Sequence, residues 1–400
     1  MGLQRHGLQC LKLYLRRKRQ AMASNAEARA QASLTDFILY FLKLGCIGFG
    51  GPIALVGYMQ KDLVDERRWI AQEDYLNGLA FSQLAPGPLA AQLAMYLGFV
   101  RAGLLGATIV GAAFILPSFL MVLIIGKAYV TLGGTRIISA LFYGIGAAVI
   151  AIIARSAMKL IKTSIKNDKL LWLVFLALGF STAITEKEIV WLFLAGGLFV
   201  MFARTSFSSW QRPRPAFSFI PFTFATFGVT GSLFFFFLKS SLFVFGSGLA
   251  IVPFLHGGVV QDHHWLTETQ FLDAVAVAMI TPGPVVITVA FIGYLVSGIS
   301  GAFAAALGVF LPVYLFVVIV GPLYKRFSRN TQIRAFVQGV TAAATGAIAG
   351  AVVVLGRHSI QDYWTAGIAV ITFLILIKWK APEPLIILVA GLLGIAIHLR

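Results

Sequence analysis

The chain carries one motif twice, as Phe81-Ser82-Gln83-Leu84-Ala85-Pro86-Gly87-Pro88 and, 196 positions later, as Val277-Ala278-Met279-Ile280-Thr281-Pro282-Gly283-Pro284. Both copies lie inside apolar stretches that we expect to cross a membrane. The prolines lack an N–H donor and clash with the preceding turn, so an α-helix cannot continue through the triplet. Within lipid, broken backbone is tolerated only where protein buries it or where it lines a polar cavity. Two breaks at matching places in two halves of one chain therefore point to a transport site.

The composition is that of an integral membrane protein. Of the 400 residues, 59% are hydrophobic and 12% are charged, and apolar runs long enough to cross a bilayer recur along the chain. The net charge of +17 follows the usual excess of Lys and Arg in short cytoplasmic loops, so we expect the lipid bilayer and no nucleic acid as partner. The two cysteines, Cys10 and Cys46, exclude a disulfide framework and a zinc site.

The two halves of the chain are copies of one another. Residues 41–96 align with residues 237–292 without a gap, and 15 of these 56 positions are identical. After one deletion the match resumes, so that Gly103 and Pro117 face Gly298 and Pro312. An internal duplication of this kind decides the fold, because each half must repeat the same helical unit.

The segments predict an all-α polytopic membrane protein with about 12 or 13 transmembrane segments. We predict a basic cytoplasmic arm at residues 1–33, a first transmembrane repeat at 34–203, a linker at 204–216, an additional span at 217–238 and a second repeat at 237–400. In each half four apolar spans follow the Pro-Gly-Pro segment. The arm has no apolar signal core with a cleavage site, so it is not expected to be a signal peptide.

The distribution of Lys and Arg favours inverted repeats. If the basic N-terminus is cytoplasmic, the charges at 155–169 and 204–214 are cytoplasmic too. Lys325, Arg326, Arg329 and Arg334 reach the same side only if the span at 217–238 inverts the second half. Inverted repeats are common among secondary transporters. A re-entrant Pro-Gly-Pro segment would change the number of spans.

A second motif, Phe-Gly, also occurs in both halves. It is Gly48-Phe49-Gly50-Gly51-Pro52 in the first and Phe245-Gly246-Ser247-Gly248 in the second. Glycines let the backbone approach a ligand closely, although small residues also serve simple helix packing in membranes. Because the motif is paired and accompanies a helix break, we assign it to the candidate site.

The Pro-Gly-Pro triplets predict an anion site made of backbone. The second proline suits the first position of a new half-helix, and the amides that follow would be free donors at a positive helix end. These are the amides of Leu89–Ala91 and Val285–Ile287. Gln83, Gln92, Thr281 and Thr288 could donate to an oxyanion or satisfy backbone carbonyls. The alternative is a plain kink with no ligand.

Lys43 and Lys239 stand at equivalent positions inside apolar runs. An intramembrane cation is costly and by default functional, whereas a lysine that reaches the interface is only an anchor. We weigh the two interpretations equally.

The sequence lacks the residues that other functional classes require. The acidic residues Asp36, Glu186, Glu188, Asp273 and Asp362 lie near the ends of spans, whereas a metal-cation exporter would bury carboxylates. His263-His264 faces Arg67-Arg68 of the other repeat, which indicates an interfacial polar role. The sequence has no phosphate-binding Gly-x-x-x-x-Gly-Lys-Ser/Thr loop, so ATP is not expected to drive the protein directly. We expect no enzyme, no catalytic residue, no metal and no cofactor.

These motifs resemble the long-chain chromate ion transporter family. The resemblance rests on the duplicated Phe-Gly motif, the Trp in the loop that follows it, the paired Pro-Gly-Pro and a later Leu-Pro, and it covers roughly residues 34–400. It implies chromate export driven by the proton-motive force, with sulfate as the related oxyanion. The second repeat departs from the first, with Met279 in place of Gln83.

The sequence therefore predicts a multi-pass secondary transporter of the cell inner (plasma) membrane. Its substrate is expected to be chromate or sulfate, with another anion exporter or a non-transporting membrane scaffold as alternatives. A homodimer is compatible with this interpretation. The candidate substrate-binding residues are Lys43, Phe49, Gly50, Gly51, Pro52, Gln83, Pro86, Gly87, Pro88, Lys239, Phe245, Gly246, Ser247, Gly248, Thr281, Pro282, Gly283 and Pro284.

Overall fold

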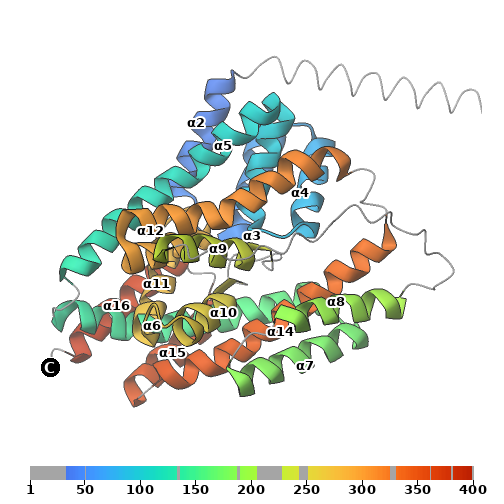
Figure 1. The fold of residues 1–400 in the computed structure, drawn as a ribbon. Coiled ribbons are helices and arrows are strands. Elements are labelled where there is room, and N and C mark those ends of the chain that lie inside the picture. Colours follow the sequence, from blue (N-terminus) through green and yellow to red (C-terminus); the bar gives the residue numbers. More distant parts are fainter. Residues whose placement is uncertain are drawn as a thin grey trace, which may run out of the picture.

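The computed structural model describes residues 33–49, 51–132, 136–186, 190–204, 228–242, 251–324, 330–360, 362–379 and 382–398. Within these ranges every regular element is a helix (Figure 1). The predicted basic arm up to residue 32, Gly50, most of the predicted linker and the motif Phe245–Gly248 lie outside the described residues.

The first half contains α2 (Leu34–Ile47), α3 (Gly51–Gln60), α4 (Gln72–Leu84), α5 (Leu89–Leu132), α6 (Arg136–Leu160), α7 (Lys169–Thr185) and α8 (Val190–Arg204). The second half contains α9 (Val229–Ser241), α10 (Ile251–His256), α11 (Glu268–Ile280), α12 (Thr288–Leu315), α14 (Thr331–Ser359), α15 (Tyr363–Lys378) and α16 (Glu383–His398). Short π-helical turns extend several of them: Lys61–Glu66, Ile161–Ile165, Gly257–Asp262 and Phe316–Val320. 3-10 turns occur at Val285–Ile287 and Gly321–Leu323.

Local sequence explains where these helices begin and end. Ser33 caps α2 by accepting the amide of Asp36 at 3.0 Å, and Thr267 forms a reciprocal capping box with Gln270 at the start of α11. α4 ends at Leu84 because the residue before a proline is pushed out of the helical region; Ala85 has φ −84° and ψ 145°.

Four helical segments are long and apolar enough to cross a membrane: Leu89–Leu132, Arg136–Ile165, Val285–Leu323 and Thr331–Arg357. Five shorter apolar helices accompany them: Lys169–Thr185, Trp191–Arg204, Val229–Ser241, Tyr363–Lys378 and Glu383–Ile397. Together they form a polytopic helical membrane protein, as the apolar runs predict. Of the predicted additional span at 217–238, residues 229–238 belong to α9 and residues 217–227 lie outside the described part.

The duplication is visible in the backbone. α5 is interrupted at Ala102 and Gly103, and α12 at Ser297 and Gly298. The two glycines have φ +58° and φ +61°, a left-handed conformation that suits a residue without Cβ. Matching breaks at matching positions show that both halves fold as the same unit.

The two halves are interlocked rather than side by side. α14 of the second half packs against α7 and α8 of the first, and α6 of the first half packs against α15 and α16 of the second (Figure 1). These contacts are tight: a Cβ on Gly144 of α6 would lie 1.9 Å from the Ala390 carbonyl oxygen of α16. Small residues that let helix backbones approach closely are typical of membrane bundles.

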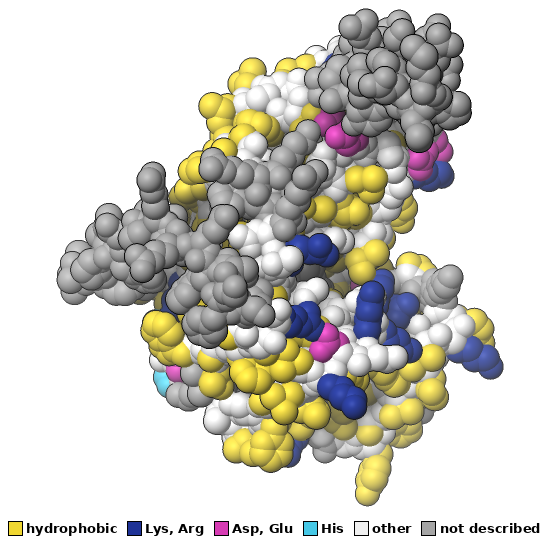
Figure 2. Space-filling view, turned by 90° about the vertical axis from the view of Figure 1, so that its right-hand side faces the viewer, with side chains coloured by type: hydrophobic (Ala, Val, Ile, Leu, Met, Phe, Trp, Pro, Cys, Tyr) yellow, Lys and Arg dark blue, Asp and Glu magenta, His cyan; other side chains and the backbone are white. Residues whose placement is uncertain are grey.

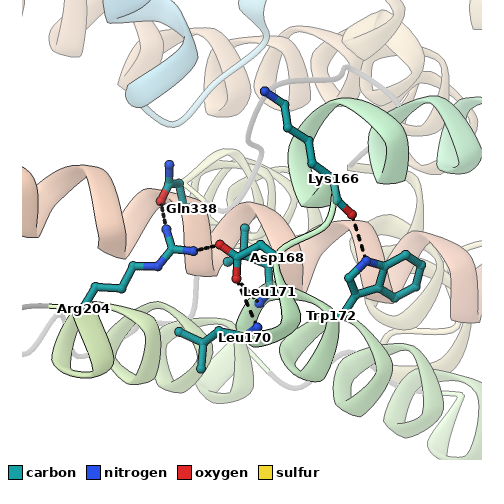
Figure 3. A network of polar contacts seen from close by, with 7 residues as sticks. All are labelled: Lys166, Asp168, Leu170, Leu171, Trp172, Arg204 and Gln338. Carbon is teal, nitrogen blue, oxygen red and sulfur yellow. Dashed lines mark hydrogen bonds and ion pairs between the residues drawn. The ribbon is translucent and has the colours of Figure 1, made fainter.

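The equivalent helices α6 and α14 run in opposite directions. At one end, Arg204 bonds both Asp168, which follows α6, and Gln338 near the start of α14 (Figure 3). At the other end, Tyr143 near the start of α6 donates to Asp362, which follows α14. The end of α6 therefore lies beside the start of α14, and the reverse also holds. Because both helices are long enough to cross the membrane, the two halves are inverted repeats, as the Lys and Arg distribution predicts.

The surface fits a membrane setting. Large side chains of the apolar helices are strongly exposed, among them Trp191 (74%), Phe180 (71%) and Ile124 (69%). In Figure 2 hydrophobic side chains cover much of the visible surface, and Lys and Arg gather in one region of it. An apolar surface of this extent needs lipid or protein to cover it.

Candidate substrate site at the broken helices

The two Pro-Gly-Pro triplets break the chain in the same way. Pro86–Pro88 separates α4 from α5, and Pro282–Pro284 separates α11 from the 3-10 turn before α12. The central glycines, Gly87 and Gly283, have φ +133° and φ +97°, which side chains strongly disfavour. α4 and α11 have 13 residues each, so each is only about 20 Å long and cannot cross the membrane alone. The predicted broken helices are confirmed.

The triplet of the second half is held by the first half. The amide of Gly283 donates to the carbonyl of Gly48 at 2.9 Å, within the Phe-Gly motif that ends α2. The hydroxyl of Ser118 in α5 donates to the Pro282 carbonyl at 2.7 Å. A Cβ on Gly283 would lie 2.0 Å from the Ser118 Oγ. Only a glycine fits between these two elements.

The triplet of the first half makes the converse contact. A Cβ on Gly87 would lie 2.8 Å from a methyl carbon of Val313 in α12, and Val313 is the repeat equivalent of Ser118. Ser241, the equivalent of Gly45, donates to the Val309 carbonyl at 2.9 Å. Each half thus presents its broken helix to the helix pair of the other half. Val244, the repeat equivalent of Gly48, lies outside the described residues.

The helix that follows the first triplet begins with buried amides. In α5 the Gln92 amide donates to the Pro88 carbonyl at 3.0 Å, so the amides of Leu89–Ala91 precede the first helical hydrogen bond. These three residues are 5%, 2% and 0% exposed. Buried amides at the positive end of a long helix are suited to an anion.

The second triplet is different, and one expectation is wrong. A 3-10 turn follows it, and the Ile287 amide donates to the Pro284 carbonyl at 2.9 Å. Ile287 is therefore not a free donor in this conformation, because the tighter turn closes a hydrogen bond one residue earlier than an α-helix would. The two half-helices do not offer the same amides.

The polar side chains around the triplets mostly satisfy backbone. Thr281 donates to the Val277 carbonyl at 2.6 Å and Thr288 to the Val285 carbonyl at 2.8 Å. Gln92 donates to the Pro86 carbonyl at 3.2 Å, while its Oε1 has no partner among the described residues. Gln83 is exposed on α4.

Two serines belong to this region although the sequence did not single them out. Ser118 joins the two halves, as described, and Ser82 is fully buried with no partner for its hydroxyl in the described part of the chain. Each stands close to a proline: Ser82 four residues before Pro86, and Ser118 directly after Pro117. That pattern was the available signal.

The Phe-Gly motif of the first half forms the break between α2 and α3. Phe49 is 37% exposed, Gly51 begins α3 with φ +72°, and Pro52 stands in the first turn, where its missing N–H costs nothing.

Lys43 and Lys239 are both exposed, on α2 and α9. Lys43 lines a pocket of about 290 Å³ with Asp36, Leu39, Tyr40, Arg67 and Trp69. The Arg67 guanidinium lies over the Trp69 ring, 4.6 Å from its centroid, and the repeat equivalents His263 and Trp265 stack at 4.2 Å. A cation–aromatic pair therefore follows the first broken segment of the first half, and a stack of two aromatic rings takes its place in the second.

One acidic residue departs from expectation. Asp273 is only 4% exposed and lies inside α11, in its second turn, so it is a buried carboxylate rather than an end residue. The helix rotation that buries it could not be deduced from its sequence position. No cluster of His, Cys, Asp or Glu that could hold a metal ion occurs among the described residues.

Interlocked inverted repeats with paired helix breaks define a membrane protein of the transporter class. A sequence profile described as "Chromate transporter" matches residues 35–201 and again residues 231–395. The chain belongs to the chromate transporter family.

Named relatives agree with this assignment. The chain is 55% identical over 377 residues to the chromate transport protein of Cupriavidus metallidurans, covering 92% of this chain and 94% of that protein. It is 51% identical over 378 residues to the probable chromate transport protein of Synechococcus elongatus, covering 91% and 95%. The uncharacterized transporter YwrB of Bacillus subtilis is 25% identical over 169 residues, which cover 41% of this chain and 86% of that protein. That protein is therefore about one repeat long. No solved structure matches the chain.

Proposed function

We propose that this protein is a secondary transporter that exports chromate across the cell inner membrane, driven by the proton-motive force. The names of the full-length relatives support chromate as substrate. An antiporter that exchanges cytoplasmic chromate for external protons would confer chromate resistance. Sulfate, which has the same charge and shape, is proposed as a second substrate.

The observation that carries the proposal is the pair of Pro-Gly-Pro breaks held by the opposite half. The Gly283 amide bonds the Gly48 carbonyl at 2.9 Å, so the broken backbone of one half lies against the motif of the other. An oxyanion bound here would accept hydrogen bonds from helix-end amides such as those of Leu89–Ala91. Broken helices at the interface of inverted repeats are the usual place for a transported substrate.

A lysine side chain would supply the positive charge that attracts the anion. We propose that Lys43 or Lys239 attracts the dianion, with Lys43 acting through the pocket that it shares with Arg67 and Trp69. Because both lysines are exposed, this role suits entry or release better than an enclosed site. Their contribution to affinity is Coulombic and depends on how dry the pocket is.

The buried amides of α5 support a transport cycle with an occluded state. Leu89–Ala91 are almost fully buried, so an anion reaches them only after the halves move. Inverted repeats achieve this by rocking one unit against the other, which exposes the same site to each side in turn.

Transport into inside-out membrane vesicles tests the proposal. Vesicles that contain the protein should accumulate chromate when their interior is made acidic, and a proton ionophore should abolish the gradient-driven part. Sulfate should compete, and an organic acid should not. Vesicles without the protein serve as the control. No chromate accumulation, with saturable uptake of an organic acid instead, would favour the other-anion exporter. No uptake of any anion would favour a scaffold.

A further inference from the structure

Asp273 is a buried carboxylate for which the anion site provides no role. It is 4% exposed, on the half-helix that leads to the second Pro-Gly-Pro triplet. The hydroxyl of Tyr129 in α5 donates to its Oδ2 at 2.6 Å. Among the described residues no Lys, Arg or His forms an ion pair with it. A buried carboxylate without a cation is costly to keep ionised.

The surroundings of this pair are apolar and come from both halves. The Tyr129 ring packs against Phe142 of α6 at 5.4 Å and against Phe291 of α12 at 5.5 Å. The contact therefore joins the first half, which supplies Tyr129, to the second half, which supplies Asp273. Any movement between the halves must change the environment of the carboxylate.

The other titratable groups on the elements around α11 have other partners or are exposed, and His256 contacts Glu268 of α11 at 2.7 Å. On α6, Tyr143 bonds Asp362 and Arg155 pairs with Glu383 of α16 at 3.8 Å. On α12, the Tyr294 ring lies against Gly126, where a Cβ would be 2.8 Å away. On α5 and α6, Lys127 and Arg136 are exposed. Tyr129 is thus the titratable group that faces the Asp273 carboxylate.

Only the second of the two repeats has a carboxylate at this position. The equivalent of Asp273 in the first half is Asn77, and the equivalent of Tyr129 is Tyr324. Tyr324 occupies the corresponding place, with its ring 5.6 Å from Phe81 of α4. The same architecture therefore carries a titratable acid on one side and an uncharged amide on the other. The half-buried Asn77 shows that the repeated unit does not itself require an acid at this position.

The position of Asp273 can also be assigned to one side of the membrane. Tyr129 lies close to the end of α5 at Leu132, near the start of α6 at Arg136. That end of α6 is opposite to the end where Lys166 and Arg204 lie, which the charge distribution makes cytoplasmic. The carboxylate is therefore on the extracytoplasmic side of the bundle, where protons enter during proton-driven export.

We propose that Asp273 is the proton-carrying group of the transporter and that Tyr129 positions it, an inference that rests on the proposed proton-driven export. In the loaded protein the carboxylate is ionised and accepts the Tyr129 hydrogen bond. In the empty protein a proton from outside neutralises it, the halves repack, and the proton leaves to the cytoplasm. Repacking without the proton would carry an unpaired charge through the apolar interface between the halves.

Two assays on the full chain in inside-out vesicles test the inference. One measures stimulation of chromate uptake by an acidic interior, and the other measures chromate exchange at equal pH, which needs no return of the empty protein. In Asp273→Asn the stimulation of uptake by the acidic interior should fall about tenfold or more relative to wild type, whereas exchange should be retained. Asp273→Glu should retain both. Glu66→Gln, which neutralises an exposed carboxylate paired with Lys61, should behave as wild type.

The outcomes separate this inference from the proposed function. Equal stimulation of wild type and Asp273→Asn overturns the proton role but leaves proton-driven export standing. Chromate uptake by wild type without any stimulation overturns both. If Asp273→Asn also loses exchange, Tyr129→Phe decides. A shift in its pH dependence toward higher pH, because the ionised carboxylate has lost a donor, supports the inference. An unchanged pH dependence overturns it.

Discussion

The hydroxyl of Ser118 in the first half donates to the carbonyl of Pro282 in the second half at 2.7 Å. Next to this bond, Gly283 has φ +97° and leaves no room for a Cβ, which would lie 2.0 Å from the Ser118 Oγ. A helix break in one half is therefore shaped around a side chain of the other. The proposed movement of the halves would have to change this contact.

Gly283→Ala should impair the protein strongly. The methyl group meets the Ser118 hydroxyl, and the backbone conformation is strained, with a combined cost of roughly 1–3 kcal/mol or more. Ser118→Ala alone should cost only about 0.5–2 kcal/mol and keep most transport. The double variant should recover part of the transport lost in Gly283→Ala. Chromate uptake corrected for protein amount measures this, and a double variant no better than Gly283→Ala would contradict the contact.

Much of the fold is predictable from the sequence because membrane-spanning helices need long apolar runs. Apolar runs predict the spans from α5 to α8 and from α12 to α16, and prolines predict where α4 and α11 end. The internal repeat then makes each half a check on the other. The Lys and Arg distribution predicts the inversion that the opposite directions of α6 and α14 confirm.

The contacts between the halves were not predictable. The sequence does not show that α14 packs against α7 and α8, because any apolar membrane helix could pack against any other. The 3-10 turn at Val285–Ile287 and the burial of Asp273 depend on local backbone geometry and helix rotation. The left-handed conformation of Gly103 at the break in α5 likewise depends on local backbone geometry.

Lys43 and Lys239 should act through their charge. Lys43→Met and Lys239→Met are expected to weaken chromate affinity, each by about tenfold or roughly 1.4 kcal/mol. Arginine at either position should retain more function than methionine, and the double methionine variant should lose transport. The concentration dependence of uptake gives the result. If both methionine variants show an unchanged concentration dependence, the lysines are anchors at the membrane interface.

Cysteine labelling should report the inverted arrangement. In a background without Cys10 and Cys46, cysteines at Lys166 and Arg334 should react with a membrane-impermeant reagent only from the cytoplasm. A cysteine at Arg136, at the opposite end of α6, should react only from outside. A tag placed after Arg400 should likewise be accessible only from outside. The reason is the network of Arg204 with Asp168 and Gln338, which brings the end of α6 to the start of α14 (Figure 3). Labelling of position 334 from outside would mean that the repeats are parallel.

Chromate uptake by the purified protein in liposomes tests the role of the broken helices most directly. The comparison is between wild type and a variant in which Pro86, Gly87 and Pro88 are all alanine, with equal insertion verified for both. Alanines would let the helix run on and give the Leu89–Ala91 amides intrahelical acceptors, which removes the proposed anion donors. We expect saturable, sulfate-sensitive uptake by wild type and none by the variant. Wild-type uptake by the correctly inserted variant would contradict the central claim that the Pro-Gly-Pro breaks form the transport site.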